Sequence, residues 1–408
     1  MRKKKVQKNQ INHHCLNLES LFLLITVFLI GFGQLQRIQL TRTIAFYGHD
    51  LFLALFVIVS FFRLLSKKEA LSNLYQRWKL LIIFGLWSLG GLLINQAIFG
   101  FNFVPWLYLS RLVIYLLFGL NISNYLQNNN CSSKWIKLLF CILLGMVLMI
   151  GFFQYLFIPD LRFLGASGWD VHYFRLAGGM LDPNFSGMIL INLLITSVFL
   201  FKNRCKNALY FGIVITTALA LTYSRSAYLS MLMVVLTSYW LKTKAIFQKD
   251  KMLSFFLVGL IVMLPFLPKP GGLGVQLTRT ETISSRAEVN ESILKQLNLQ
   301  QLLLGRGFFT PSINTKITDR VVHANFPDNF FIFLLSSTGV IGLSLILFFL
   351  YQEIKRGFIK KNPALILLLV GTLVHSMFNL TILEPINLLV LLICLNALKI
   401  KNEPASSA

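Results

Sequence analysis

Long runs of apolar residues alternate with short polar segments along the whole chain. The apolar runs are roughly 17–22 residues long, which is the length that a helix needs to cross the hydrocarbon core of a membrane. The apolar–polar alternation that marks the strands of a membrane barrel is missing. The pattern therefore predicts an all-α integral membrane protein with about twelve transmembrane helices. They are expected near residues 18–36, 45–65, 79–98, 103–122, 136–158, 186–202, 207–223, 226–241, 252–268, 329–350, 363–380 and 383–398.

The lysines and arginines predict the orientation of these helices. Most of them lie in the short segments that separate alternate apolar runs, and such segments face the cytoplasm by the positive-inside rule. This orientation places the N-terminal run Arg2–Lys5 and the tail with Lys399 and Lys401 on the same side. No cleavage site of small residues follows the first apolar run, so we expect an uncleaved first helix. The chain is expected to be a multi-pass protein of the cytoplasmic (inner) membrane with both termini cytoplasmic.

Composition agrees with a membrane protein, since 56% of the residues are hydrophobic and only 13% are charged. The formal net charge of +23 could indicate a nucleic-acid partner, because basic surfaces attract phosphate. The positive residues are, however, distributed as membrane topology requires. We therefore expect membrane lipid around the chain and no nucleic acid.

Two segments predicted on the outer side are long, at 159–185 and 269–328. Long loops in a compact protein usually carry function. The second segment divides the chain into three parts. Residues 1–268 contain helices 1–9 and the shorter extracytoplasmic loop 159–185, residues 269–328 form the large extracytoplasmic loop between helices 9 and 10, and residues 329–408 contain helices 10–12 and a cytoplasmic tail.

The cysteines and histidines give no signal for a metal or a cofactor. None of the five cysteines falls in an outer segment, so no disulfide and no cysteine metal site are expected. The histidines have no spacing of the HExxH kind. We expect neither a metal nor a cofactor.

One arginine of the large loop is marked by its neighbours. Ser285 and Glu288 have the spacing of a capping box, which predicts a helix with Arg286 at its first position. The free N–H groups of a helix start and a guanidinium would together form an anion site. An exposed arginine on a surface helix is the alternative.

Two further arginines lie at predicted outer boundaries of the membrane. Arg225 occupies a short break between two apolar runs, where an arginine either reaches to the interface or binds a ligand. Arg175 precedes a glycine-rich turn, and Asp182 or Asn184 is expected near the cap of the following helix. A structural role for this turn is equally compatible with its residues.

A carboxylate completes this set. Asp328 is predicted at the start of the tenth helix, where it could cap the helix or act as a general base. Several arginine-bearing segments and this carboxylate converge on the outer side. The combination suits a lipid-linked phosphate or pyrophosphate, because the arginine fork grips phosphate oxygens in pairs and keeps its charge.

Three motifs, in this order, resemble those of the O-antigen ligase and polymerase superfamily. Residues 225–229 match its Arg-x-x-x-Leu, and Arg286 resembles its loop arginine, followed by an amphipathic helix and the glycine turn at 305–307. Asp328-Asn329, nine residues and then Gly339-Val340-Ile341-Gly342 are similar to the His-Asn-x9-Gly-x-x-Gly of the ligases. The resemblance covers nearly the whole chain, including the position of the large loop.

The resemblance implies a polysaccharide polymerase that joins polyprenyl-pyrophosphate-linked oligosaccharide repeat units at the outer face of the membrane. It implies a metal-independent glycosyltransferase without a nucleotide sugar, acting in exopolysaccharide, capsule or O-antigen synthesis. It also implies that the protein acts within a multi-protein export system, with a flippase and a chain-length regulator as its expected partners.

The resemblance also implies roles for single residues. Arg225 and Arg286 are expected to hold the pyrophosphate, with Arg175 as a further contact. Asp328 is expected to orient or deprotonate the acceptor, with His323 as the substitute for this role. Arg306 and Asn329 are expected to bind substrate. These last two residues lie within the matched motifs.

Three other functions stay open. An O-antigen ligase would transfer finished glycan to another acceptor, but it would have histidine where this chain has Asp328, a departure that favours the polymerase branch. A multi-span transporter or lipid-linked glycan flippase usually has two related halves and charged residues within its spans. Here Arg111 is the main charge within a span, and the large loop divides the spans nine and three. A scaffold without catalysis would leave the arginines unexplained.

Overall fold

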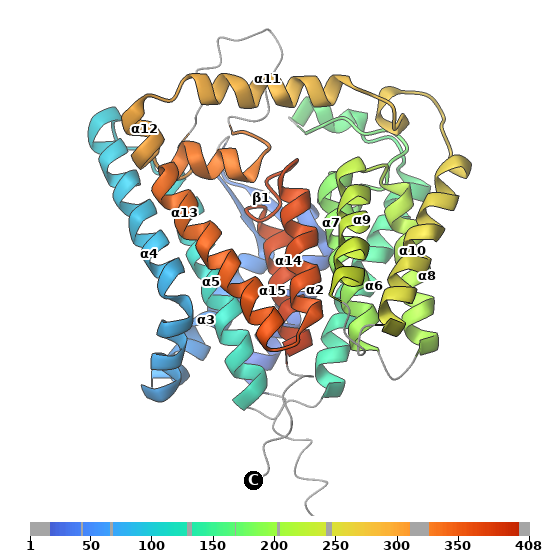
Figure 1. Cartoon of the computed structure of the whole chain (residues 1–408), viewed down its shortest axis with the longest axis horizontal. Coiled ribbons are helices and arrows are strands. Elements are labelled where there is room, and N and C mark those ends of the chain that lie inside the picture. Colours follow the sequence, from blue (N-terminus) through green and yellow to red (C-terminus); the bar gives the residue numbers. More distant parts are fainter. Residues whose placement is uncertain are drawn as a thin grey trace, which may run out of the picture.

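The computed structural model describes residues 17–41, 44–65, 68–128, 133–167, 169–201, 205–241, 247–310 and 326–399, and these are mostly helical. The longer helices form one bundle, and α11 (Glu281–Lys295) lies across one end of it (Figure 1). The helices of the bundle are α2 (Leu18–Phe32), α3 (Gly48–Leu65), α4 (Lys68–Phe99), α5 (Val104–Asn128), α6 (Ser133–Phe157), α7 (Pro183–Leu200), α8 (Cys205–Leu221), α9 (Arg225–Trp240), α10 (Phe247–Met263), α13 (Phe330–Ile359), α14 (Pro363–Ser376) and α15 (Pro385–Lys399).

Short elements join these helices. Strands β1 (Arg37–Gln39) and β2 (Ala45–Tyr47) form an antiparallel pair with Ile38 opposite Phe46. The remaining elements are α12 (Leu299–Leu304) and the 3-10 helices η1 (Gly33–Gln36), η2 (Arg162–Ser167), η3 (Gly178–Met180), η4 (Leu264–Phe266) and η5 (Leu273–Val275).

Each of the expected spans contains a helix of the bundle. Within the described residues, six helices are long and apolar enough to cross a membrane, and three shorter helices are apolar as well. The structure is therefore mostly helical and has the helices of a multi-pass membrane protein, whereas the number of crossings, the division of the chain by the large loop and the orientation stay predictions. The six are Leu18–Gln36, Trp78–Phe99, Val104–Ile122, Lys134–Phe157, Pro183–Leu200 and Phe330–Ile359.

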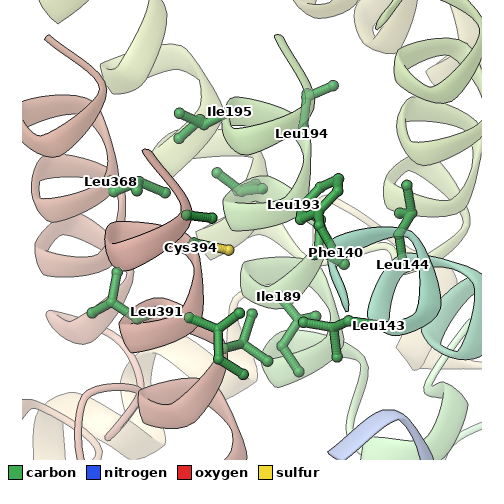
Figure 2. Packing of buried hydrophobic residues seen from close by; sticks show 14 of the residues in the cluster. Phe140, Leu143, Leu144, Ile189, Leu193, Leu194, Ile195, Leu368, Leu391 and Cys394 are labelled. Carbon is green, nitrogen blue, oxygen red and sulfur yellow. The ribbon is translucent and has the colours of Figure 1, made fainter. Parts of the chain in front are cut away.

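Helix α7 forms the centre of the bundle. Its residues from Ser186 to Leu200 are all buried, as expected for a helix that is apolar on every side. Figure 2 shows side chains of α7, among them Ile189 and Leu193, between those of α6 and α15, such as Leu143 and Leu391. The hydrophobic core fixes the α7 axis, and with it the connection that leads into this helix.

Two glycines allow the backbones of α12 and α13 to pack closely against each other. Gly339 has a φ of 68°, interrupts the helical geometry of α13, and lies directly against the carbonyl of Leu303. Gly305, with a φ of 82°, lies against the carbonyl of Ser337. The N–H of Arg306 donates to the carbonyl of Ser336 at 2.9 Å across this contact. Close backbone approach with positive φ requires glycine at both positions, so Gly305 of the second motif and Gly339 of the third have a packing explanation.

Candidate functional site

Polar side chains cap three helices close to α11. Asp182 caps α7 by accepting the N–H of Asn184 at 2.6 Å, which confirms the predicted cap. Ser224 caps α9. The cap of α13 is Asn329, whose Oδ1 accepts the N–H groups of the second and third residues that follow, at 2.9 and 3.2 Å. Asp328 therefore does not cap α13, and its carboxylate is available for other contacts.

The predicted start of α11 is wrong. The helix begins at Glu281, and the N–H of Ser284 already donates to the carbonyl of Thr280 at 3.1 Å. Because the backbone is helical before Ser285, that residue is an interior position and no capping box forms. Arg286 lies in the second turn, so the free N–H groups of the helix start do not converge on its guanidinium.

Arg286 instead forms an ion pair with Asp328. Its Nε lies 2.8 Å from Oδ2 of Asp328, and its Nη2 donates to Oδ1 of Asn379 at 3.3 Å. The side chains of Arg286 and Asp328 are 34% and 41% exposed, so both can reach a ligand from outside the bundle. The structure thus brings together the loop arginine and the carboxylate that the sequence analysis placed in one site.

Arg225, the first residue of α9, points toward the large loop. Its Nη1 donates to the carbonyl of Leu277 at 3.4 Å and, at shorter range, to that of Arg279. The guanidinium therefore ties the start of α9 to the segment that leads into α11. This contact orders loop backbone beside Arg286.

Arg175 is buried beneath this segment, with 5% of the residue exposed. Its Nε donates to the carbonyl of Thr222 at 2.9 Å and its Nη2 to that of Tyr223 at 3.4 Å. Burial, followed by the positive charge of Arg279, lowers the pKa of Arg175 to about 10, which leaves it charged at neutral pH. The residue holds the turn that precedes Arg225, so its most direct contact is with protein backbone.

A fourth arginine, Arg279, belongs to the same cluster, although the sequence analysis assigned it no role. Its Nη1 donates to the carbonyl of Gln276 at 2.9 Å. Burial lowers the pKa of Arg279, and the charges of Arg225 and Arg286 lower it further. Like charges affect each other in this way only over short distances. We call Arg175, Arg225, Arg279 and Arg286 the arginine cluster.

Asp328 has the properties of a base near this cluster. Partial burial raises the pKa of its carboxyl group above the ordinary value, Arg286 lowers it, and the negative charges of Asp182 and Asp170 raise it again. The net direction is upward, toward the range in which a carboxylate accepts a proton effectively.

Two other residues, Arg306 and His323, were predicted to belong to the site. Arg306 donates from Nε to Oε1 of Gln301 at 3.1 Å and from Nη2 to the carbonyl of Gln296 at 2.6 Å. These contacts fasten the connection between α11 and α12, and the predicted role of Arg306 in substrate binding stays a prediction. His323 lies outside the described residues.

Among the described residues, one group of side chains could hold a metal ion. Asp170, His172 and Asp182 offer ligand atoms that lie within 4.8 Å of one another. Burial and then Arg175 lower the pKa of His172 to about 4, so the ring is neutral and able to ligate. The adjacent guanidinium charges of Arg175 and Arg279 oppose a cation at this place, as their effect on His172 indicates.

Buried polar residues beneath Arg286 were not predicted. Asn379, which accepts from Arg286, donates from Nδ2 to Oγ of Ser226 at 3.1 Å. The same Oγ lies 3.1 Å from Nε2 of His375. The network therefore links Arg286 to Ser226, the residue that follows Arg225 in the chain. The signal in the sequence was a histidine at the outer end of an apolar run.

Fold and site together define a multi-pass membrane protein with an arginine cluster and a paired carboxylate at one end of the bundle. Residues 210–347 match the family model described as O-antigen ligase, about a third of the chain. No curated protein matches the chain.

The match confirms the resemblance to the O-antigen ligase and polymerase superfamily. It includes Arg225, Arg279, Arg286, Arg306 and Asp328, and ends beyond Gly339. The chain is therefore similar to the O-antigen ligase family over the segment that contains three members of the arginine cluster and Asp328.

Proposed function

We propose that the protein is a polysaccharide polymerase that joins polyprenyl-pyrophosphate-linked oligosaccharide repeat units at the outer face of the cytoplasmic membrane. Exopolysaccharide, capsule and O-antigen are the product classes that this activity would serve. The observation that carries the proposal is the arginine cluster beside Asp328, a carboxylate of raised pKa. Asp328 and three of the four arginines lie within the segment that matches the O-antigen ligase family.

The arginine cluster is suited to the pyrophosphate of the donor. As the bond between the anomeric carbon and the pyrophosphate oxygen breaks, negative charge grows on that oxygen. Fixed guanidinium groups stabilise such charge and favour the transition state over the bound donor. Arg225 and Arg286 are the proposed phosphate ligands. Arg175 holds the turn before Arg225 by two hydrogen bonds and supports this arrangement from below.

Asp328 is suited to the acceptor. A hydroxyl group of the second lipid-linked unit attacks the anomeric carbon and forms the new glycosidic bond, while its proton passes to the carboxylate of Asp328. The leaving polyprenyl pyrophosphate departs with the electron pair of the broken bond. A raised pKa makes Asp328 a stronger base than an ordinary carboxylate. Asn329 caps α13 and so fixes the backbone next to this base.

The transfer is proposed to be independent of metal ions, because four guanidinium groups supply the positive charge. Activity is therefore expected to persist in excess EDTA, measured as polymer formed by washed membranes. Activity lost in EDTA and restored by Mg²⁺ or Mn²⁺ would contradict this, and would transfer the charge role to a cation at Asp170, His172 and Asp182.

The polymerase is favoured over the ligase because Asp328 stands where the ligases have histidine. A flippase and a chain-length regulator of the same export system are the proposed partners. The experiment that tests the function deletes the gene in its host and complements it with wild type, Arg225→Ala, Arg286→Ala or Asp328→Ala. Arg162→Ala is a matched control, because Arg162 is 60% exposed and pairs with Asp160 in the connection between α6 and α7, which contains none of the three exchanged residues.

Surface and lipid-linked glycans are then separated by size. A single lipid-linked repeat unit in the deletion and in the three site variants, with normal polymer in the control, is the expected result. Long polymer that stays on its polyprenyl carrier would indicate a ligase. An unchanged ladder of products in the deletion would contradict glycosyl transfer by this protein.

A further inference from the structure

A buried histidine terminates the hydrogen-bond network that begins at Arg286. His375 lies in the last turn of α14 and is fully buried. Its Nε2 lies 3.1 Å from Oγ of Ser226, and its Nδ1 lies 2.5 Å from Oγ1 of Thr381. Both ring nitrogens therefore have a hydroxyl partner, and the ring orientation is fixed from two sides.

The charge of Arg286 gives this network a direction. A guanidinium can only donate, so the side-chain oxygen of Asn379 must face Arg286 and its nitrogen must face Ser226. Ser226 thus accepts from Asn379. Its Oγ also lies 3.1 Å from Nε2 of His375 and 3.2 Å from Oγ of Ser224, so Ser226 joins Asn379 to both residues.

The network joins three parts of the chain that are distant in sequence. Asn379 and Thr381 lie in the connection that follows α14, Ser226 lies in the first turn of α9, and Arg286 lies in α11. Asn379 and Thr381 are 4% and 1% exposed. Hydrogen bonds at such depth are protected from competing water and hold their partners in one geometry.

An apolar side chain could fill the space of His375 and would need no polar partners. A buried histidine, by contrast, is costly whenever one of its hydrogen-bond partners is lost. The network ends on a guanidinium that is 34% exposed and paired with Asp328. Preorganised charges act in catalysis because they need no rearrangement during the reaction.

We propose that His375 is a positioning residue of the glycosyl-transfer site, which acts through Ser226 and Asn379 to hold the guanidinium of Arg286 in place for the donor pyrophosphate. This inference rests on the proposed function of the arginine cluster. His375 itself does not touch the substrate, because it is fully buried.

Two substitutions of His375 separate its two contacts. The amide of glutamine reaches the position of Nε2, so His375→Gln retains a partner for Ser226 and loses the one for Thr381. The amide of asparagine reaches only the position of Nδ1, so His375→Asn retains Thr381 and loses Ser226. Ser226→Ala breaks the same link with a minimal change in volume, and guards against a folding defect of the histidine variants.

The test measures binding of geranylgeranyl pyrophosphate to the full-length protein in lipid nanodiscs, with the melting temperature of each variant as a check on folding. His375→Asn and Ser226→Ala are expected to weaken binding about tenfold, the effect of one lost hydrogen bond. His375→Gln is expected to bind within about twofold of wild type. A purely structural residue would not separate the two substitutions in this way.

The decisive comparison repeats His375→Asn and Ser226→Ala in an Arg286→Ala background. If His375 acts through Arg286, neither change weakens binding further, because interacting residues are not additive. An equal tenfold loss in both backgrounds overturns the inference alone. Absence of measurable binding by the wild-type protein overturns the proposed function of the arginine cluster, and the inference with it.

Discussion

Replacement of Arg286 by lysine changes the shape of its charge and leaves the sign unaltered. In the structure its guanidinium contacts Asp328 through Nε at 2.8 Å and Asn379 through Nη2 at 3.3 Å. An ammonium group is a single point of charge and cannot reproduce two donors in a fixed plane. Arg286→Lys is therefore expected to retain the positive charge and to lose the simultaneous contacts with Asp328 and Asn379.

The size of the effect follows from the contacts. One hydrogen bond that involves a charged group contributes about 1.5–3 kcal/mol, which corresponds to a factor of about 10–150 in rate. The Arg286 side chain is 34% exposed, so solvent screening favours the lower end. We expect kcat/KM to fall about tenfold in Arg286→Lys, and further in Arg286→Ala.

The assay follows polymer formation by purified protein in nanodiscs with lipid-linked repeat units as the substrate. Arg162→Lys is the matched control, because it makes the same replacement at an exposed ion pair with Asp160. A kcat/KM for Arg286→Lys that equals that of wild type would refute the argument that geometry, and not charge alone, matters at this position.

Three further predictions concern the base, the buried arginine and the glycine contact. The rate should fall with falling pH as Asp328 gains its proton, and its raised pKa places this limb above the ordinary carboxylate value of about 3.9; a pH–rate profile flat down to pH of about 4 would contradict the assignment. Arg175→Met should lower the melting temperature, since two carbonyls lose their donor at a cost of about 1–3 kcal/mol each; an unchanged melting temperature would refute this. Gly339→Ala should destabilise the protein more than Gly259→Ala, because a Cβ at Gly339 meets the Leu303 carbonyl whereas none of the described atoms lies within 4 Å of one at Gly259; equal melting temperatures would exclude this explanation.

The helices were predictable because the membrane imposes a simple rule on length and apolarity. Each expected span contains a helix, and the observed helix begins or ends within about ten residues of the expected position. The differences have local causes. Residues 45–47 form a strand ahead of α3, and residues 33–36 tighten into a 3-10 turn after α2. Hydropathy reports how much of a segment is apolar, and such changes of backbone geometry at its ends are outside its reach.

The candidate site was predictable where short motifs carried it. Arg225, Arg286 and Asp328 were expected near one another, and the ion pair and the mutual charge effects of the arginines place them together. Arg175 was expected in the same region, and it lies there as a buried support of the turn before Arg225. Their catalytic roles stay predictions.

Tertiary contacts decided the rest. The capping box at Ser285 was a valid local pattern, but the helix had already begun at Glu281, so the local preference did not decide. Arg279 lies in an unremarkable loop sequence, and only folding brings its charge beside Arg225. His375 is distant in sequence from Arg286, and a chain of hydrogen bonds between three segments cannot be read from either.

The most direct test of the central claim supplies purified protein with one lipid-linked repeat unit as both donor and acceptor. The account predicts lipid-linked dimers and longer chains, one free polyprenyl pyrophosphate for each new glycosidic bond, and neither product from Arg286→Ala. If the wild-type protein releases no polyprenyl pyrophosphate and forms no longer chain, the proposal that this protein is a repeat-unit polymerase is wrong.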